Sequence, residues 1–273
     1  GGDVEPGALA LAAGSVVGPA QIGLLAAIGC ATVVVRPRPR VVVLSTGSEL
    51  VQPGEQLAAG QIYDSNSFAL TAAARDAGAI AYRVGAVSDD AETLRATIED
   101  QLIRADIVVT TGGVSVGAYD VVKEALSSVG DEDEPGSGVE FRKLAMQPGK
   151  PQGFGSIGPD HTPLLALPGN PVSSYVSFEL FVRPAIRALM GLEDVHRPTA
   201  RARLDTEKAL TSPEGRRQFL RGRYDAEEGT VTPVGGSGSH LIAALAQADA
   251  LIVVDEDTTS VEPGTETDVI LLR

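Results

Sequence analysis

The stretch Arg40-Val41-Val42-Val43-Leu44-Ser45-Thr46-Gly47-Ser48-Glu49 decides the fold. Its first half is apolar without alternation, which is typical of a strand that is buried on both faces of a parallel sheet. Its second half is a small turn with a glycine and several hydroxyl groups. Residues 107–115 and 164–174 repeat this design. Because parallel strands end at one edge of their sheet, we expect the three turns to meet in one ligand-binding crevice.

The glycines of these turns suit them to an anionic ligand. A glycine lets backbone amides approach an anion closely, and a helix that follows adds its positive N-terminal end. We therefore expect a phosphate-like group to bind at the turns. The candidate contacts are Thr46, Gly47, Gly112, Gly113, Ser115, Gly169, Asn170 and Ser173.

The overall charge limits the choice of ligand. The chain has 22 Lys and Arg against 36 Asp and Glu, a net charge of -14. It therefore lacks the broad positive surface that nucleic-acid binding requires. A small anionic ligand needs local amides, a few placed Lys or Arg side chains, or a divalent metal.

Residues 8–35 carry no charged side chain, a length that could cross a membrane. Glycines and Pro19 interrupt the stretch, which favours a turn and a short helix that ends at Gly29, so we expect no membrane span. The single cysteine, Cys30, excludes an intrachain disulfide and favours the cytoplasm. The start, Gly1-Gly2-Asp3, is unlike a signal peptide, and we expect a fragment or a processed product.

The pattern along the chain predicts three parts: residues 1–36 as a remnant of an N-terminal or linker domain, 37–190 as an α/β domain, and 191–273 as a β-domain. Strands alternate with helices in the second part, which favours a doubly wound, mostly parallel sheet. Short strands between Pro and Gly turns in the third part indicate a small barrel or sandwich. The expected strands are 40–45, 79–87, 107–111, 139–145, 153–157, 163–167, 201–206, 218–224, 230–234, 250–254 and 267–272. The expected helices are 66–78, 89–105, 121–126 and 171–189.

Three carboxylates, Glu49, Asp89 and Asp120, each follow a different strand near the expected crevice. Carboxylates combined with ligand oxygens suit a hard cation such as Mg²⁺. The alternative is that Asp89 or Asp120 only caps a helix. Residues 64–67 precede a helix, and N-capping explains at least one of them.

Placed cations are rarer in this acidic chain. Lys143 ends a strand, and Lys150 lies in the turn Gln147-Pro148-Gly149-Lys150-Pro151, where it could neutralise a phosphate or remain solvated. The basic stretch 216–223 could contact a ligand or form an exposed barrel face. The three histidines show no zinc-site spacing.

Five motifs, in this order, resemble those of the molybdopterin molybdenumtransferase family (MoeA and the gephyrin E domain). They are residues 45–50 (STGSEL), 61–66 (QIYDSN), 111–117 (TGGVSVG), 147–151 (QPGKP) and 167–173 (LPGNPVS), and residues 2–4 and 238–240 add to them. The resemblance implies a three-layer α/β/α molybdopterin-binding domain followed by a C-terminal β-barrel. It also implies insertion of molybdenum from molybdate into adenylylated molybdopterin, with a divalent cation and release of AMP.

Carried over by position, the resemblance assigns roles to individual residues. Acidic site residues would be Asp3, Glu49, Asp89 and Asp120, and Lys143 would be the functional lysine. Pro168 and Pro171 would shape the turn under the ligand, and Arg221 and Ser239 would contribute from the barrel. The resemblance further implies a homodimer, and a partner in the adenylyltransferase that supplies the substrate.

Two departures from the family pattern stand out: the longer N-terminal portion is missing, and Gln147 stands where many members carry Lys. Other readings remain open. A molybdopterin adenylyltransferase shares the α/β layer and the Gly-Gly-Val-Ser turn, but it lacks a barrel. The remaining alternatives are a scaffold module of the gephyrin type, which would need an apolar peptide groove, and a generic nucleotide-binding domain.

Overall fold

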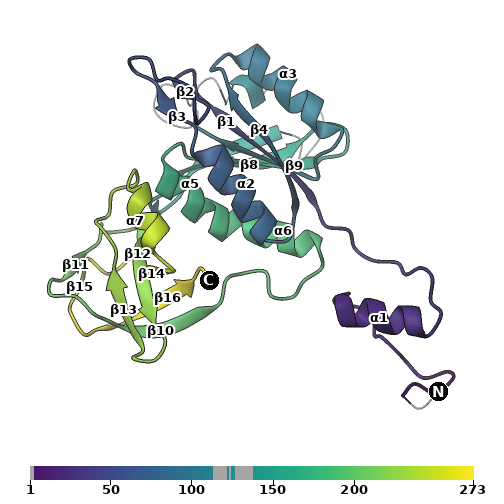
Figure 1. Ribbon diagram of the computed structural model, residues 1–273. Coiled ribbons are helices and arrows are strands. Elements are labelled where there is room, and N and C mark those ends of the chain that lie inside the picture. The colour runs from purple at the N-terminus through teal and green to yellow at the C-terminus, as the bar shows by residue number, and fades with distance from the viewer. Residues whose placement is uncertain (1–2, 113–121, 123, 127–137) are drawn as a thin grey trace.

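The central strand of the α/β domain is β1 (Arg40–Thr46), whose apolar residues are buried on both faces. The computed structural model describes residues 3–112, 122, 124–126 and 138–273. β1 lies between β4 (Ile80–Val87) and β5 (Ile107–Thr111), and β9 (Thr162–Leu167) follows β5; all four run parallel. The three expected turns therefore leave the same edge of one sheet (Figure 1).

The far side of this sheet is antiparallel, as a mostly parallel sheet allows. β8 (Pro151–Ile157) pairs antiparallel with β9, and β6 (Gly138–Lys143) pairs antiparallel with β8. Only residues 158–161 join β8 to β9. A parallel connection needs a crossover of a dozen or more residues, so this short turn can only produce a hairpin.

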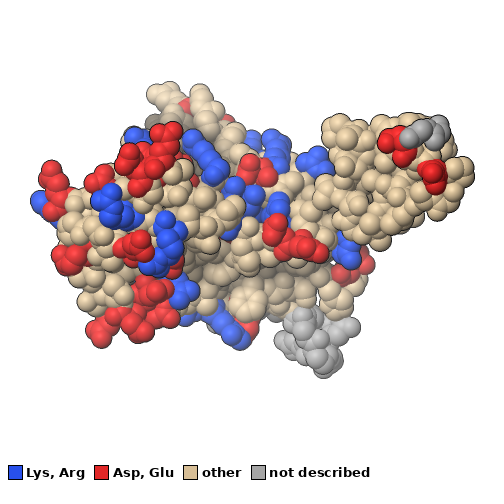
Figure 2. Space-filling view, turned by 90° about the horizontal axis from the view of Figure 1, so that it is seen from below, with Lys and Arg blue, Asp and Glu red and all other residues tan. Residues whose placement is uncertain are grey.

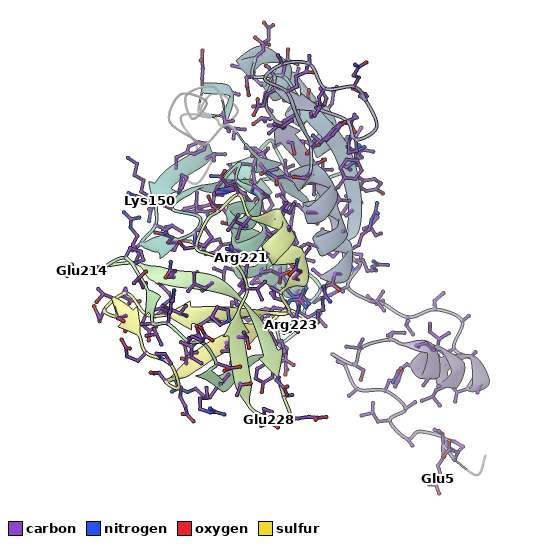
Figure 3. The ribbon with its side chains drawn as sticks, turned by 60° about the vertical axis from the view of Figure 1, so that its left-hand side comes forward. Glu5, Lys150, Glu214, Arg221, Arg223 and Glu228 are labelled. Atoms are coloured by element: carbon purple, nitrogen blue, oxygen red, sulfur yellow. The ribbon has the colours of Figure 1, made fainter. Side chains whose placement is uncertain are left out.

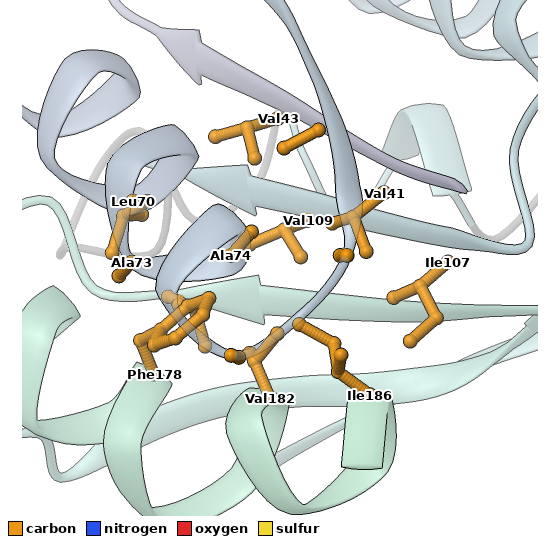
Figure 4. Packing of buried hydrophobic residues seen from close by; sticks show 14 residues of the cluster. Val41, Val43, Leu70, Ala73, Ala74, Ile107, Val109, Phe178, Val182 and Ile186 are labelled. Carbon is orange, nitrogen blue, oxygen red and sulfur yellow. The ribbon is translucent and has the colours of Figure 1, made fainter. Parts of the chain in front are cut away.

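Helices cover both faces of the sheet and make three layers. One face carries α2 (Asn66–Asp76) and a helix of three segments, α5 (Pro171–Ser177), η1 (Phe178–Val182) and α6 (Arg183–Leu189). The expected single helix 171–189 is thus continuous but contains a π-helical segment. Figure 4 shows side chains of these helices packed on β1 and β5. The other face packs against α3 (Ala91–Leu102) and the helical residues 122 and 124–126.

The C-terminal strands form a closed barrel, which decides between the two expected architectures. Its strands are β10 (Thr199–Leu204), β16 (Glu266–Leu271), β14 (Ala250–Val254), β12 (Arg217–Asp225) and β13 (Thr230–Pro233), in this spatial order. β13 pairs with both β12 and β10, so no strand is left at an edge. Short elements also described are β2 (Leu50–Val51), β3 (Ile62–Tyr63), β11 (Leu210–Thr211), α7 (Ile242–Gln247) and β15 (Ser260–Val261).

The barrel is attached to the α/β domain by backbone, apolar and ionic contacts. β7 (Met146–Gln147) adds to the barrel sheet beside β12. Buried apolar residues from both parts form one cluster around Met146, Val176 and Phe219. Arg197, in the connection between the parts, donates to Glu179 and Asp76, each at 2.8 Å. These contacts fix the barrel beside the start of α5.

Residues 3–35 of the lead segment lie apart from both domains (Figure 1). Its helix α1 (Pro19–Ala27) has the expected Pro start and is followed by Gly29 at φ +78°, but none of its residues is buried. Figure 2 shows charged side chains of both signs over the domains, whereas this segment presents mostly uncharged atoms. No helix among the described residues is long and apolar enough to cross a membrane.

Candidate functional site

The turns after β1, β5 and β9 pack directly on one another. A Cβ atom built on Gly112, at φ +96°, would lie 2.3 Å from the carbonyl oxygen of Thr46. A Cβ on Gly169 would lie 3.2 Å from the Cα of Gly112. Glycine is therefore required at Gly112 for close approach as well as for its backbone angle. The three turns therefore meet, as expected from the sequence, and ligand binding between them stays a prediction.

Asn66 at the start of α2 ties two of the turns together. Its side-chain amide donates to Thr111 Oγ1 at 3.1 Å and to the carbonyl of Gly169 at 2.7 Å. Thr111 Oγ1 in turn donates to the carbonyl of Pro168 at 3.0 Å. The sequence indicated residues 64–67 as capping candidates and residues 61–66 as a family motif, but it did not predict this bridging role of Asn66. The signal was present, since a helix that follows β1 in such a sheet begins at the same edge as the turns.

Asp64 of the same segment has a different task. It is almost fully buried, and its carboxylate accepts from the Ser67 amide at 3.0 Å and from Ser45 Oγ at 2.9 Å. It therefore caps the first turn of α2 and fastens that turn to β1 below the crevice.

Glu49 and Asp89 both lie at the turn that follows β1. The Ser48 amide donates to Asp89 Oδ2 at 3.1 Å, and the Asp89 amide donates to Ser48 Oγ at 3.3 Å. The Glu49 carboxylate lies over Gly47, where a built Cβ would be 2.6 Å from Glu49 Oε2. The two carboxylates therefore flank one residue, Ser48.

The alternative interpretation of Asp89 as the cap of α3 is wrong. The N-cap is Asp90, whose side chain accepts from the Thr93 amide at 2.8 Å. Hydrogen bonds from the Thr93 hydroxyl and amide hold the pKa of Asp90 below its usual range. Asp89 therefore does not cap α3, and it contacts the turn after β1 instead.

Three predicted site residues, Gly113, Ser115 and Asp120, lie outside the described residues. Asp3 belongs to the lead segment, which lies apart from both domains (Figure 1). In the part of the chain that is described, no three His, Cys, Asp or Glu side chains form a metal-binding group. Glu49 and Asp89 nevertheless fit Mg²⁺, which is usually held by one or two carboxylates together with substrate phosphates.

A cavity of about 420 Å³ opens between the α/β domain and the barrel. Its walls are the 147–151 turn, the first turn of α5 and a barrel loop at residues 237–240. The lining residues are Met146, Gln147, Pro148, Gly149, Lys150, Pro151, Ser173, Arg216, Ser237, Gly238, Ser239 and His240. None of them is acidic, although the chain carries 36 Asp and Glu. Such a local excess of cations and hydroxyl groups suits an anion.

Hydrogen bonds on the side away from the cavity hold the 147–151 turn, which carries Lys150. Gln152 Nε2 donates to the carbonyl of Gly149 at 2.7 Å and to Ser177 Oγ of α5 at 2.5 Å. The Leu144 amide donates to the carbonyl of Lys150 at 2.7 Å. Gly149 has φ +100°, and a built Cβ there would be 2.8 Å from Ser177 Oγ, so a larger residue would push the turn away from α5. Lys150 therefore extends from an anchored turn (Figure 3).

The barrel wall is held by Arg221, whose side chain is 2% exposed. Its Nη2 donates to the carbonyl of Gly236, and its own carbonyl accepts from the Val234 amide at 2.8 Å. The carbonyl of Ser239 accepts from the Val172 amide of α5 at 3.0 Å. Burial lowers the pKa of Arg221. Arg221 is absent from the cavity lining and positions the loop that brings Ser239 to it.

Some of the polar residues predicted from the sequence line the cavity, and others do not. Lys150, Ser173 and Ser239 line the cavity, whereas Lys143 is exposed at the end of β6 and is not among the lining residues. In the basic stretch, Arg216 lines the cavity while Arg217 pairs with Asp255 and Glu256 on the barrel surface. The exposed-face alternative therefore holds for Arg217, and contact of Arg216 with a ligand stays a prediction.

Arg216 and His240 lie in stretches noted in the sequence, but neither they nor Ser237 were assigned individual roles in the site. Their signal would have been proximity of the barrel loop to α5, which nothing in the local sequence reveals.

Comparison with known proteins assigns a class to this architecture. Residues 42–188 match the family described as a probable molybdopterin binding domain, which is more than half of the chain. Residues 203–272 match the family described as the MoeA C-terminal region (domain IV). The fold is therefore that of a molybdopterin-binding-domain protein with a MoeA-type barrel.

Individual relatives narrow the class to a family. Molybdopterin molybdenumtransferase 2 of Mycobacterium tuberculosis is 48% identical over 98% of this chain and 65% of its own length. The Haemophilus influenzae molybdopterin molybdenumtransferase is 37% identical over 97% of this chain and 64% of its own length. The crystal structure of a molybdopterin biosynthesis MoeA protein from Pyrococcus horikoshii aligns with TM-score 0.77 at 33% identity, covering 94% of this chain and 60% of that one. The chain belongs to the molybdopterin molybdenumtransferase family, and it spans a little under two thirds of the length of these curated relatives.

Proposed function

We propose that this protein inserts molybdenum from molybdate into adenylylated molybdopterin and releases AMP. One observation carries the proposal. In a chain of net charge -14, the cavity beside α5 is lined by Lys150, Arg216 and three serines and by no carboxylate. Molybdate is a tetrahedral dianion whose oxygens accept hydrogen bonds, and ammonium, guanidinium and hydroxyl groups are the donors that it requires.

The two parts of the site would divide the substrates between them. The glycine turns at the sheet edge would seat the phosphates of the nucleotide, through backbone amides and the start of α5. The residues proposed for this role are Thr46, Gly47, Gly112, Gly113, Ser115, Pro168, Gly169, Asn170 and Pro171. Lys150, Ser173 and Ser239 would hold molybdate in the adjoining cavity, and Arg221 would position the Ser239 loop. α5 follows the third turn and also lines the cavity, so the two ligands would lie side by side.

Divalent metal enters the proposal through the carboxylates. Glu49, Asp89 and Asp120 would hold Mg²⁺, which would polarise the phosphoanhydride that is cleaved. The chain's own contribution there is to direct both carboxylates at one turn. The Ser48 amide does this for Asp89 by its hydrogen bond at 3.1 Å.

The remaining assignments rest on the sequence pattern and on the resemblance to the family. They include domain boundaries near residues 36 and 190, a cytoplasmic location, a homodimer, and an adenylyltransferase partner that delivers the substrate. Lys143 would assist from the end of β6. In a homodimer Asp3 would serve the crevice of the partner copy, which agrees with its distance from its own crevice.

The test is calorimetric binding of adenylylated molybdopterin, with and without Mg²⁺, to wild type and Glu49→Gln. Binding in the micromolar range or tighter that requires Mg²⁺ and weakens in Glu49→Gln supports the proposal. The matched control is Glu55→Gln, an exposed glutamate in the loop before β3. A folded wild-type protein that does not bind this nucleotide under either condition contradicts the proposal.

A further inference from the structure

Three basic side chains line the cavity beside α5. Two of them are Lys150 and Arg216, and Gln147 in the same wall is an uncharged amide. His240 is the third basic lining residue, and an imidazole ordinarily changes charge between pH 5 and 8. His240 is therefore the imidazole among the three basic side chains that line the cavity.

Contacts on both sides of His240 in the sequence hold its loop in place. Its imidazole lies over Gly238, because a Cβ built on Gly238 would be 3.1 Å from His240 Cε1. The His240 carbonyl accepts a hydrogen bond from the amide of Ile242, the first residue of α7, at 2.9 Å. The carbonyl of Ser239, the preceding residue, accepts one from the Val172 amide of α5. His240 is thus an exposed side chain on a loop that is fixed at both ends.

The groups around His240 leave no acidic competitor in the cavity. The 147–151 turn contributes Lys150, and Arg216 is the residue before β12. The first turn of α5 contributes only Ser173. α7, which follows His240, is Ile-Ala-Ala-Leu-Ala-Gln and carries no charge. Glu214, two residues before Arg216, is not among the lining residues. With no carboxylate there to pair with it, a protonated His240 has an anion in the cavity as its natural partner.

We propose that His240 is a specificity-determining residue of the oxyanion cavity, one that binds the tetrahedral dianion when its imidazole is protonated. The inference rests on the proposed function and extends it, because it makes oxyanion affinity rise as the pH falls through the range in which an imidazole titrates. By linkage, a dianion that favours the charged imidazole about tenfold would bind about fivefold more tightly at pH 6 than at pH 8.

The experiment is calorimetric titration of the full chain with sodium molybdate at pH 6 and pH 8. We compare wild type with His240→Gln and with His196→Gln, a matched substitution in the connection to the barrel, outside the cavity lining. Wild type and His196→Gln should show the fivefold ratio, and His240→Gln should show a ratio within twofold of one. Circular dichroism at both pH values establishes that each variant is folded.

A second variant separates a charge role from a structural one. His240→Lys carries a permanent charge, so it should bind molybdate at pH 8 about as tightly as wild type binds at pH 6. Equal wild-type affinity at the two pH values, or an unchanged ratio in His240→Gln, overturns the role of His240 and leaves the oxyanion cavity standing. No molybdate binding by wild type at either pH overturns the cavity assignment as well.

Discussion

Replacing Gly112 by alanine tests whether the crevice is built by direct packing of its turns. The new methyl group would lie 2.3 Å from the Thr46 carbonyl oxygen, whereas ordinary contacts are 3.4 to 4 Å, so one of the two turns must move by about 1 Å. The left-handed backbone conformation costs about 1–2 kcal/mol for a side chain. Overpacking in a tight interior adds about 1–3 kcal/mol. We therefore expect Gly112→Ala to lower the free energy of unfolding by about 2–5 kcal/mol.

The matched control for this variant is Gly54→Ala. Gly54 has φ +97°, nearly the φ +96° of Gly112, but nothing lies within 4 Å of its built Cβ. Its loss should be only the backbone cost of about 1–2 kcal/mol. Urea unfolding followed by circular dichroism measures both variants, and the difference between them isolates the contact with Thr46. Equal losses for the two substitutions would refute the packing of the turns as described.

Two further predictions concern side chains that organise the α/β domain. Asn66→Ala removes donors to Thr111 and Gly169, so the free energy of unfolding should fall by about 1–3 kcal/mol in urea unfolding; an unchanged value would contradict the bridging role. Burial alone raises the pKa of Asp76, but hydrogen bonds and charges of Arg183 and Arg197 outweigh it and leave the pKa lowered. A lowered carboxyl pKa stabilises the fold above the unfolded value of about 3.9, and this contribution is lost as the pH falls through the folded value. Wild type should therefore be more stable than Asp76→Asn at pH 7, and the two should converge on acidification in thermal unfolding; a constant difference between them would contradict the ion-pair account.

The sequence predicted the sheet better than the site. Strands such as 40–45 and 107–111 are buried on both faces, and an uninterrupted apolar run can hardly form anything else between turns. The antiparallel pairing of β8 depends on the length of one connection, which is visible in the sequence only after the strand ends are known. The sequence offered two neighbouring aspartates, Asp89 and Asp90, as equally suitable N-caps of α3. The structure shows that Asp90 is the cap.

Local sequence patterns could not predict the cavity between the domains. Lys150 and Ser239 lie about ninety residues apart in the chain, and the pairing of β7 with β12 brings their segments to one place. The family resemblance assigned Arg221 to the site, but only the structure shows that the closed barrel buries it beneath the loop that it supports. Contacts of this kind follow from how the barrel docks on α5, which depends on an apolar cluster drawn from both parts of the chain.

The central claim is that the cavity between α5 and the barrel binds an oxyanion, and molybdate titration of Lys150→Ala tests it most directly. A charge-assisted hydrogen bond contributes about 1.5–3 kcal/mol, so the affinity should fall about 10- to 100-fold relative to wild type. Lys208→Ala, at an exposed barrel lysine outside the cavity lining, should bind as wild type does. Molybdate binding that is equally strong in wild type, Lys150→Ala and Lys208→Ala would place the oxyanion elsewhere and contradict the account.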